Sequence, residues 1–451
     1  MKIIKNKREK VVFILALFVI ALAFEVSTGA IDMPASSLKI SMDESIESAL
    51  GSMEDIKARE VQAEKTYHKY RETQALRYPD LVGHGEWTNN ARYPVNQRYP
   101  AGGISDYELG IGAVLRQVVW SFGRISSAVE AAEKSLEISK LDVQVKKADV
   151  IYRAKVSYFT LIFAQRGLDI VLESYQNSLD NKKILQDRSV MGRVSRKDNI
   201  KIEADIAARV PLVTNVKADI ISAENTLKRI MGLDFDTEIE ITDTFEENYS
   251  EKEYDELVRY LWEKEPTLKM LEENISLQNT LIKGEMSEYL PNISAFATWD
   301  YMGRSDQAKD WYVGKERLMD HFGTIGLQLE IPIFDCGRVS EKIKQAQKEK
   351  EKAVLEFEKV SRDLALELKN AVSDYNEYVK TLQANIKSVN LSEKSFKLFQ
   401  DFFRTGQVTL LELNDAELSL ANQKLARDTT LFNLNVTLAR IERLIAEGVD
   451  T

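Results

Sequence analysis

The sequence predicts a mainly α-helical protein with a membrane β-sheet, built as a duplicated unit. Two stretches, from Gly123 to Gly192 and from Gly337 to Gly406, have no proline and repeat apolar or small residues every seven positions. That period is typical of coiled-coil helices, and each helix would be about 100 Å long. Ahead of each stretch, apolar and polar residues alternate with the period of a half-buried β-strand.

The amino-acid composition excludes several classes of protein. The only cysteine, Cys336, excludes a disulfide within the chain and a cysteine-rich zinc site. The three histidines, His68, His84 and His321, lie far apart and form no catalytic cluster. A net charge of −10 argues against nucleic acid as a partner, because phosphates need a basic surface. We therefore expect no catalytic residues, no metal site and no cofactor, and hence no enzyme.

Residues 1–30 have the pattern of a secretory signal peptide. Basic residues precede an apolar run from Val11 to Phe24, and small residues follow it. The run is shorter than the ~20 residues of a membrane-spanning helix, which favours a cleaved signal over an uncleaved anchor. The mature chain is therefore expected outside the cytoplasm.

The first repeat is expected over residues 31–235. Ser41 and Glu44 form a capping-box pattern that begins a helix, and Pro79 ends it near Tyr78. Two antiparallel strands follow, from about Leu81 and from about Tyr107, joined by an extended loop. The long helix then ends in a turn at about 190–195, and a second helix returns from Arg196 to about Met231, with Pro211 as a point of bending or interruption.

Residues 236–256 are expected to form an acidic linker between the two repeats. From Asp234 to Glu256 there are eleven Asp or Glu residues and one Lys. The segment lacks the regular oxygen-ligand spacing of a calcium loop, so a solvated connector is the favoured interpretation and ion binding stays open.

The second repeat is expected over residues 257–451. Phe334, Gly337 and Arg338 match Trp120, Gly123 and Arg124 at one constant offset, and Gly406 matches Gly192 at the same offset. Agreement over so long a stretch indicates a duplication.

Four strands cannot close a barrel, since eight is about the smallest number that does. An open edge in lipid leaves backbone groups without hydrogen bonds. We therefore expect a homotrimer with a 12-stranded β-barrel, four strands per chain, continued by a long α-helical barrel. The alternative fold is a pair of soluble hairpins on a coiled coil, which would make a structural or adhesive rod of the cell envelope without a pore.

Several short motifs occur in a fixed order within this duplicated frame, from about residue 38 to residue 447. They are Ser41–Leu50, Leu290–Pro291–Asn292–Ile293, Ile331–Pro332–Ile333–Phe334 with Gly337–Arg338, and Gly406, Glu412, Leu413, Asp415, Ala416 and Leu420. In these motifs the chain resembles the TolC family of outer-membrane efflux proteins. The resemblance implies a trimeric outer-membrane channel that extends into the periplasm and exports substrates passively. It also implies a periplasmic adaptor protein and an inner-membrane transporter as partners, as in a tripartite efflux pump or type I secretion system.

The resemblance further implies that the helix turns carry the function. Glu412 and Asp415 match acidic residues that ring the narrow periplasmic entrance of the family, and Asp198 matches an acidic residue of the first-repeat turn. In a trimer, carboxylates at Glu412 and Asp415 would attract cations and raise one another's pKa. We expect Arg193, with Arg196 and Lys197, to form ion pairs with these acids and hold the turn shut.

Adaptor docking in the family uses a Val-Gly-Leu-like turn. The corresponding positions here are Met191–Gly192–Arg193 and Thr405–Gly406–Gln407. The glycines suit a tight turn. The apolar third residue of the family motif is replaced by Arg193 and Gln407, so the location of docking is expected but its details differ.

Overall fold

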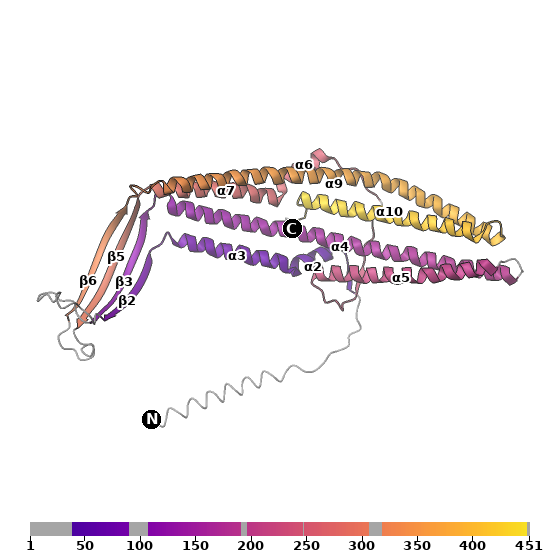
Figure 1. Cartoon of the computed structure of the whole chain (residues 1–451), viewed down its shortest axis with the longest axis horizontal. Helices are drawn as coiled ribbons and strands as arrows, with labels where there is room; N and C mark the ends of the chain where they lie inside the picture. Colours follow the sequence, from indigo (N-terminus) through magenta and orange to yellow (C-terminus); the bar gives the residue numbers. More distant parts are fainter. Residues whose placement is uncertain (1–37, 90–106, 191–195, 247, 306–317, 449–451) are drawn as a thin grey trace, which may run out of the picture. The chain divides into compact units, whose positions relative to one another are not determined.

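The computed structural model describes residues 38–89, 107–190, 196–246, 248–305 and 318–448 (Figure 1). The predicted signal peptide and the turn residues Met191, Gly192 and Arg193 lie outside these ranges. Within them, no helix is both long enough and apolar enough to cross a membrane.

Contacts divide the chain into two units. The small unit holds β1 (Leu38–Ile40) and β4 (Ile239–Ile241), which pair in parallel with Leu38 opposite Ile239. The large unit holds all the other elements described below.

The first helical segment is broken in two, where the sequence predicts one helix. It consists of α2 (Met42–Ser52) and α3 (Glu54–Ala75), with the extended backbone of Met53 between them. Met53 is buried with Ala49 and Ile56 against Val150 and other residues of the long helix α4 (Arg124–Val190). Tertiary packing therefore overrides local helix propensity at this point. The predicted capping box of Ser41 and Glu44 is confirmed at the start of α2.

The predicted strands are confirmed as one antiparallel sheet in the order β2-β3-β5-β6. The strands are β2 (Asp80–Asn89), β3 (Tyr107–Trp120), β5 (Asn292–Ser305) and β6 (Leu318–Glu330). Their register pairs Asp80 with Arg116 and Asn292 with Glu330. Every strand end that connects to a helix therefore lies at the same end of the sheet.

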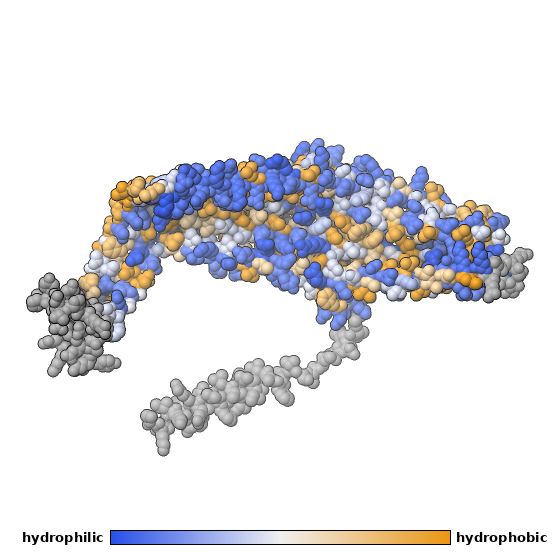
Figure 2. Space-filling model, viewed as in Figure 1, coloured by the Kyte–Doolittle hydropathy of each residue, from blue (hydrophilic) through white to orange (hydrophobic). Residues whose placement is uncertain are grey.

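The two faces of the sheet differ in polarity. One face exposes large apolar side chains, of which Ile325 is 88% and Leu327 is 75% accessible. The opposite face carries the polar residues Arg116, Ser294, Thr298, Asp300 and Gln328. Figure 2 shows further apolar side chains where the sheet meets the helices, and Ile333 and Phe334 are exposed there. Trp299 is exposed and lies in the middle of β5.

The helices of the two halves correspond in order and length. In the first half α2 has 11 residues, α3 has 22, α4 has 67 and α5 (Arg196–Met231) has 36. In the second half α6 (Tyr254–Lys264) has 11 residues, α7 (Pro266–Met286) has 21, α9 (Arg338–Thr405) has 68 and α10 (Leu410–Leu444) has 35. A short 3₁₀ helix, η2 (Ser287–Tyr289), joins α7 to the sheet. α5 runs unbroken through Pro211, so that proline does not interrupt the helix.

The acidic segment combines exposed acids with contacts to the helices. It contains β4, and Phe245 is buried and packs 6.0 Å from the ring of Phe159 on α4. Asp243 accepts hydrogen bonds from the Met42 backbone N–H at 2.8 Å and from the Tyr158 hydroxyl at 2.9 Å. The described acids of the segment are exposed, as expected for a solvated connector, while Phe245 between them is buried.

A glycine allows a contact that spans three strands of the sheet. His84 on β2, Gly112 on β3 and Asp300 on β5 lie in one register row, and Nε2 of His84 is 3.0 Å from Oδ1 of Asp300. A Cβ at Gly112 would touch Asp300 Oδ1 and lie 2.8 Å from the backbone oxygen of Trp299.

We predict that Gly112→Ala lowers the stability of the folded protein by about 1–3 kcal/mol, as overpacking does. The control is Gly110→Ala on the same face of β3, where an added Cβ meets no atom within 4 Å. Thermal unfolding followed by circular dichroism in detergent measures both variants. Equal transition temperatures for the two would contradict the prediction.

Candidate functional site

The turn between α9 and α10 is built around Gly406. This residue has φ 81°, in the left-handed region that glycine adopts without steric cost. The backbone N–H of Gly406 donates to the Phe403 oxygen at 3.1 Å, and that of Gln407 donates to the Phe402 oxygen at 2.9 Å. These bonds satisfy carbonyls at the end of α9. Thr405–Gly406–Gln407 therefore forms the tight turn that its glycine predicts.

Glu412 closes the first turn of α10. Its carboxylate accepts hydrogen bonds from the Thr409 N–H at 2.7 Å and hydroxyl at 2.8 Å, while the Glu412 N–H donates to Thr409 Oγ1 at 3.3 Å. The backbone hydrogen bond from Thr409, followed by the bond from its hydroxyl, lowers the pKa of Glu412. Within one chain, Glu412 is thus an ionised capping residue. The mutual raising of pKa values expected in a trimer stays a prediction.

The other predicted acids lie on two different helices. Asp415 is exposed three residues after Glu412, so both carboxylates lie on one face of α10. Asp198 is half-buried in the first turn of α5. Arg193 lies outside the described residues, so the ion pairs expected between the first turn and these acids stay a prediction.

An apolar cluster joins the ends of the two hairpins, α4–α5 and α9–α10. It draws residues from all four helices, and Asn414 of α10 also donates to Asp205 of α5 at 2.7 Å. The buried members are Leu185, Ile202, Phe396, Phe403, Leu410, Leu413 and Leu420. The cluster therefore fixes the position of one turn relative to the other.

Arg188 is a residue of this site that the sequence reasoning missed. Its guanidinium extends from the last turns of α4 to the end of α9, where Nη1 donates to the Phe403 oxygen at 3.1 Å. The guanidinium carbon also lies 5.4 Å from the centroid of the Phe403 ring. A cation at a helix C-terminus is favourable, which is the general signal that could have pointed to Arg188.

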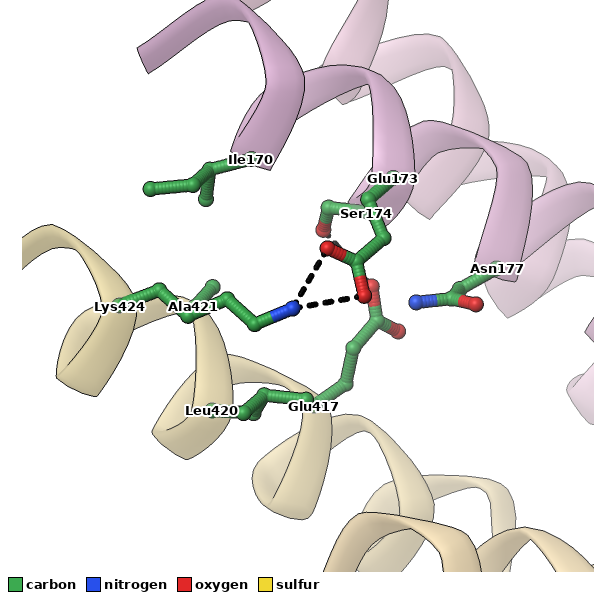
Figure 3. A pocket seen from close by; sticks show the side chains of 8 residues that line it. All are labelled: Ile170, Glu173, Ser174, Asn177, Glu417, Leu420, Ala421 and Lys424. Carbon is green, nitrogen blue, oxygen red and sulfur yellow. Dashed lines mark hydrogen bonds and ion pairs between the residues drawn. The ribbon is translucent and has the colours of Figure 1, made fainter. Parts of the chain in front are cut away.

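Glu417 is the second missed residue, and it is buried between the hairpins (Figure 3). Its Oε1 accepts a hydrogen bond from the Ser174 hydroxyl of α4 at 2.7 Å and lies 3.1 Å from Nη1 of Arg209 on α5. Burial raises the pKa of the Glu417 carboxyl, and the bonds from Ser174 and Arg209 oppose that rise. Leu413, Glu417 and Leu420 share one stripe of α10, so an acid within an apolar stripe was the available signal.

Two more charged side chains of α10 face the neighbouring helices. Lys424 Nζ lies 2.7 Å from Glu173 on α4 and 3.7 Å from Glu393 on α9. Dashed lines in Figure 3 mark the contact with Glu173. Asp428 is buried, with Arg166 of α4 at 3.3 Å. The contact between α10 and α4 therefore combines charges with apolar packing. In the described ranges, no three His, Cys, Asp or Glu side chains are grouped to hold a metal ion.

Comparison with known proteins assigns this fold to a class. Residues 259–446 match the family described as Outer membrane efflux protein. The solvent efflux pump outer membrane protein SrpC of Pseudomonas putida is 22% identical over 403 residues, which cover 85% of this chain and 80% of SrpC. The cation efflux system protein CusC of Escherichia coli is 21% identical, over 86% of this chain and 82% of CusC.

A solved structure has the same fold over most of the chain. The outer membrane protein VceC of Vibrio cholerae aligns with a TM-score of 0.76 at 16% identity, over 90% of this chain and 96% of VceC. The fold is therefore that of the TolC-like outer-membrane channels. The resemblance to outer-membrane efflux proteins that the sequence motifs predict is confirmed by these matches in sequence and in fold.

We predict that Thr409→Ala loosens the first turn of α10. The change removes the hydroxyl of the capping box, which typically costs about 0.5–2 kcal/mol. Hydrogen exchange of peptides from residues 410–416 should become faster, and Thr409→Ser, which keeps the hydroxyl, is the control. Unchanged exchange in Thr409→Ala would contradict the capping role.

Proposed function

We propose that three copies of this chain form an outer-membrane channel that is the passive exit duct of a tripartite efflux pump or a type I secretion system. One observation carries this proposal. A four-stranded sheet exposes apolar residues on one face, has polar residues on the other, and connects at one end to two long helical hairpins. An exposed apolar face suits lipid, and a polar face suits a water-filled lumen.

The sheet also supports association. In the described chain β2 and β6 are the edge strands, each paired on one side. Lipid does not hydrogen-bond the free backbone groups of an edge, so the edges join β6 of one subunit to β2 of the next. Three subunits make a 12-stranded barrel, an even number wide enough to enclose water. The alternative, a structural or adhesive rod without a pore, does not explain why one face of the sheet exposes large apolar side chains.

The channel lies in the bacterial outer membrane, and its helices extend into the periplasm. It performs no catalytic step. Its energy comes from an inner-membrane transporter, to which a periplasmic adaptor protein connects it. The names of the relatives refer to solvents and to cations, and either class of substrate is compatible with a polar lumen.

The periplasmic entrance lies at the helix turns. Glu412 and Asp415 form an acidic ring in the trimer, and Asp198 with Arg193 stabilises the closed state. Two exposed carboxylates on one helix face support this assignment, because six in a trimer attract cations at close range. Adaptor docking takes place at Met191–Gly192 and at Thr405–Gly406–Gln407, where the left-handed Gly406 presents a tight turn.

The duplicated frame organises this duct. The signal peptide of residues 1–30 comes first. Residues 31–235 and 257–451 are the two structural repeats, and residues 236–256 connect one repeat to the other. The near-equal lengths of α4 and α9, and of α5 and α10, support this division.

We predict that Glu412→Ala combined with Asp415→Ala raises single-channel conductance in a planar bilayer and weakens selectivity for cations, since fewer charges constrict the entrance. The control replaces Glu351, an exposed acid of α9 that pairs with Lys348, by Ala. Unchanged conductance in the double variant would count against the gate, and absence of any conductance or trimer in the wild type would count against the channel.

A further inference from the structure

Glu417 joins three helices through a single oxygen. Its Oε1 receives the contacts from Ser174 of α4 and Arg209 of α5, and Arg209 also donates to the Ser174 hydroxyl. Its Oε2 is buried without a hydrogen-bond partner among the described residues. An ionised carboxylate with one such oxygen is poorly compensated, whereas a protonated carboxyl carries less charge into the low-dielectric interior.

The contact between α4 and α10 around Glu417, here called the seam, also contains polar atoms of α4 that lack hydrogen-bond partners in the described chain. Asn181, on the same face of α4 as Ser174, is fully buried, and neither of its amide atoms has a partner in the described chain. A cavity of about 10 Å³ lies between α4 and α10, lined by Ser174, Asn177 and Glu417 among others (Figure 3). Such a seam is looser than a close-packed apolar interface.

α5 has a built-in weak point beside this contact. Pro211 lies two residues after Arg209 and has no backbone N–H, so one hydrogen bond of the helix is missing there. Helices bend most readily at such positions. Arg209, the residue of α5 that contacts Glu417, therefore lies close to a position at which the helix can bend.

We propose that Glu417 is a proton-dependent lock that positions α10 against α4 and α5, holding the two hairpins together more tightly when it is protonated than when it is ionised. Its effect on opening of the entrance rests on the proposed function, but the lock itself is a property of the single chain.

The charged groups around Glu417 and its burial decide whether its pKa is raised or lowered in the packed seam. Asp205 of α5 and Glu173 of α4 oppose its ionisation, while Arg209 favours it; Lys424 of α10 is shared by Glu173 and by Glu393 of α9. Burial is the largest influence, and the pKa of Glu417 in the packed seam is raised above its ordinary value of 4.5. When the seam opens and water reaches the carboxyl, the pKa returns towards that value.

The packed seam therefore binds the proton more tightly than the open seam. By linkage, the extra stability of the packed seam is complete below pH 4.5 and is lost as the pH rises through the raised value. The hairpins are held firmly in mild acid and are released more easily near neutrality.

The test is hydrogen exchange of the full-length protein in detergent at about pH 5 and about pH 7.5, on either side of the range in which buried carboxyls titrate. Rates are corrected for intrinsic exchange at each pH. In the wild type, the protection of peptides from residues 413–424 should fall by roughly threefold or more at the higher pH. In Glu417→Gln, which is isosteric and cannot ionise, protection should stay high at both values.

Two further variants complete the design. Glu351→Gln removes an exposed carboxylate of α9 and should keep the wild-type pH dependence. Ser174→Ala removes a hydrogen bond that lowers the pKa of Glu417, so this pKa rises further. The lock therefore requires that the loss of protection moves to higher pH in this variant. A wild type without pH dependence, or a Glu417→Gln variant that keeps it, would overturn the lock. Exchange does not depend on conductance, so the lock and the channel function fail separately.

Discussion

The unpaired edges of the four-stranded sheet constrain the rest of this molecule. A strand whose backbone groups face lipid without partners is too costly to persist, so the edges of β2 and β6 need further strands. The exposed apolar face adds to this requirement, because it is stable only in an apolar surrounding. The sheet also determines where the helices begin, since every strand end that leads into a helix lies at the same end of the sheet.

The contact between the two long helical hairpins combines apolar packing with buried ionisable side chains. Apolar residues such as Leu413 and Phe403 supply the packing between them, while Glu417 and Asp428 introduce buried ionisable groups into the contact between the hairpins. A seam of apolar residues alone would be more stable, because buried ion pairs gain little over well-packed hydrophobic residues. Charges in this position reduce the stability of the contact between the hairpins and make it sensitive to protons and to the loss of a partner. Such a contact suits an element that has to separate.

Much of the fold could be predicted because it depends on long periodic patterns. The sevenfold spacing located α4 and α9 to within a residue or two, and the alternation located all four strands of the sheet. Sequence reasoning missed features that distant residues decide. Met53 breaks a helix because it packs against α4, and Phe245 in the acidic segment is buried against α4. Of the site, the turn at Gly406 and the acids on α10 followed from sequence, whereas Arg188 and Glu417 did not.

The sequence by itself determined the lengths of the long helices α4 and α9, the strand pattern, the internal repeat and the glycine of the α9–α10 turn, because each follows from a pattern along the chain. Only the tertiary structure decided the sheet order β2-β3-β5-β6, the contact of Arg188 with Phe403 and the burial of Glu417 with Ser174 and Arg209. Those features join residues hundreds of positions apart. Their energies come from desolvation and from partners on other helices, which no local pattern in the sequence contains.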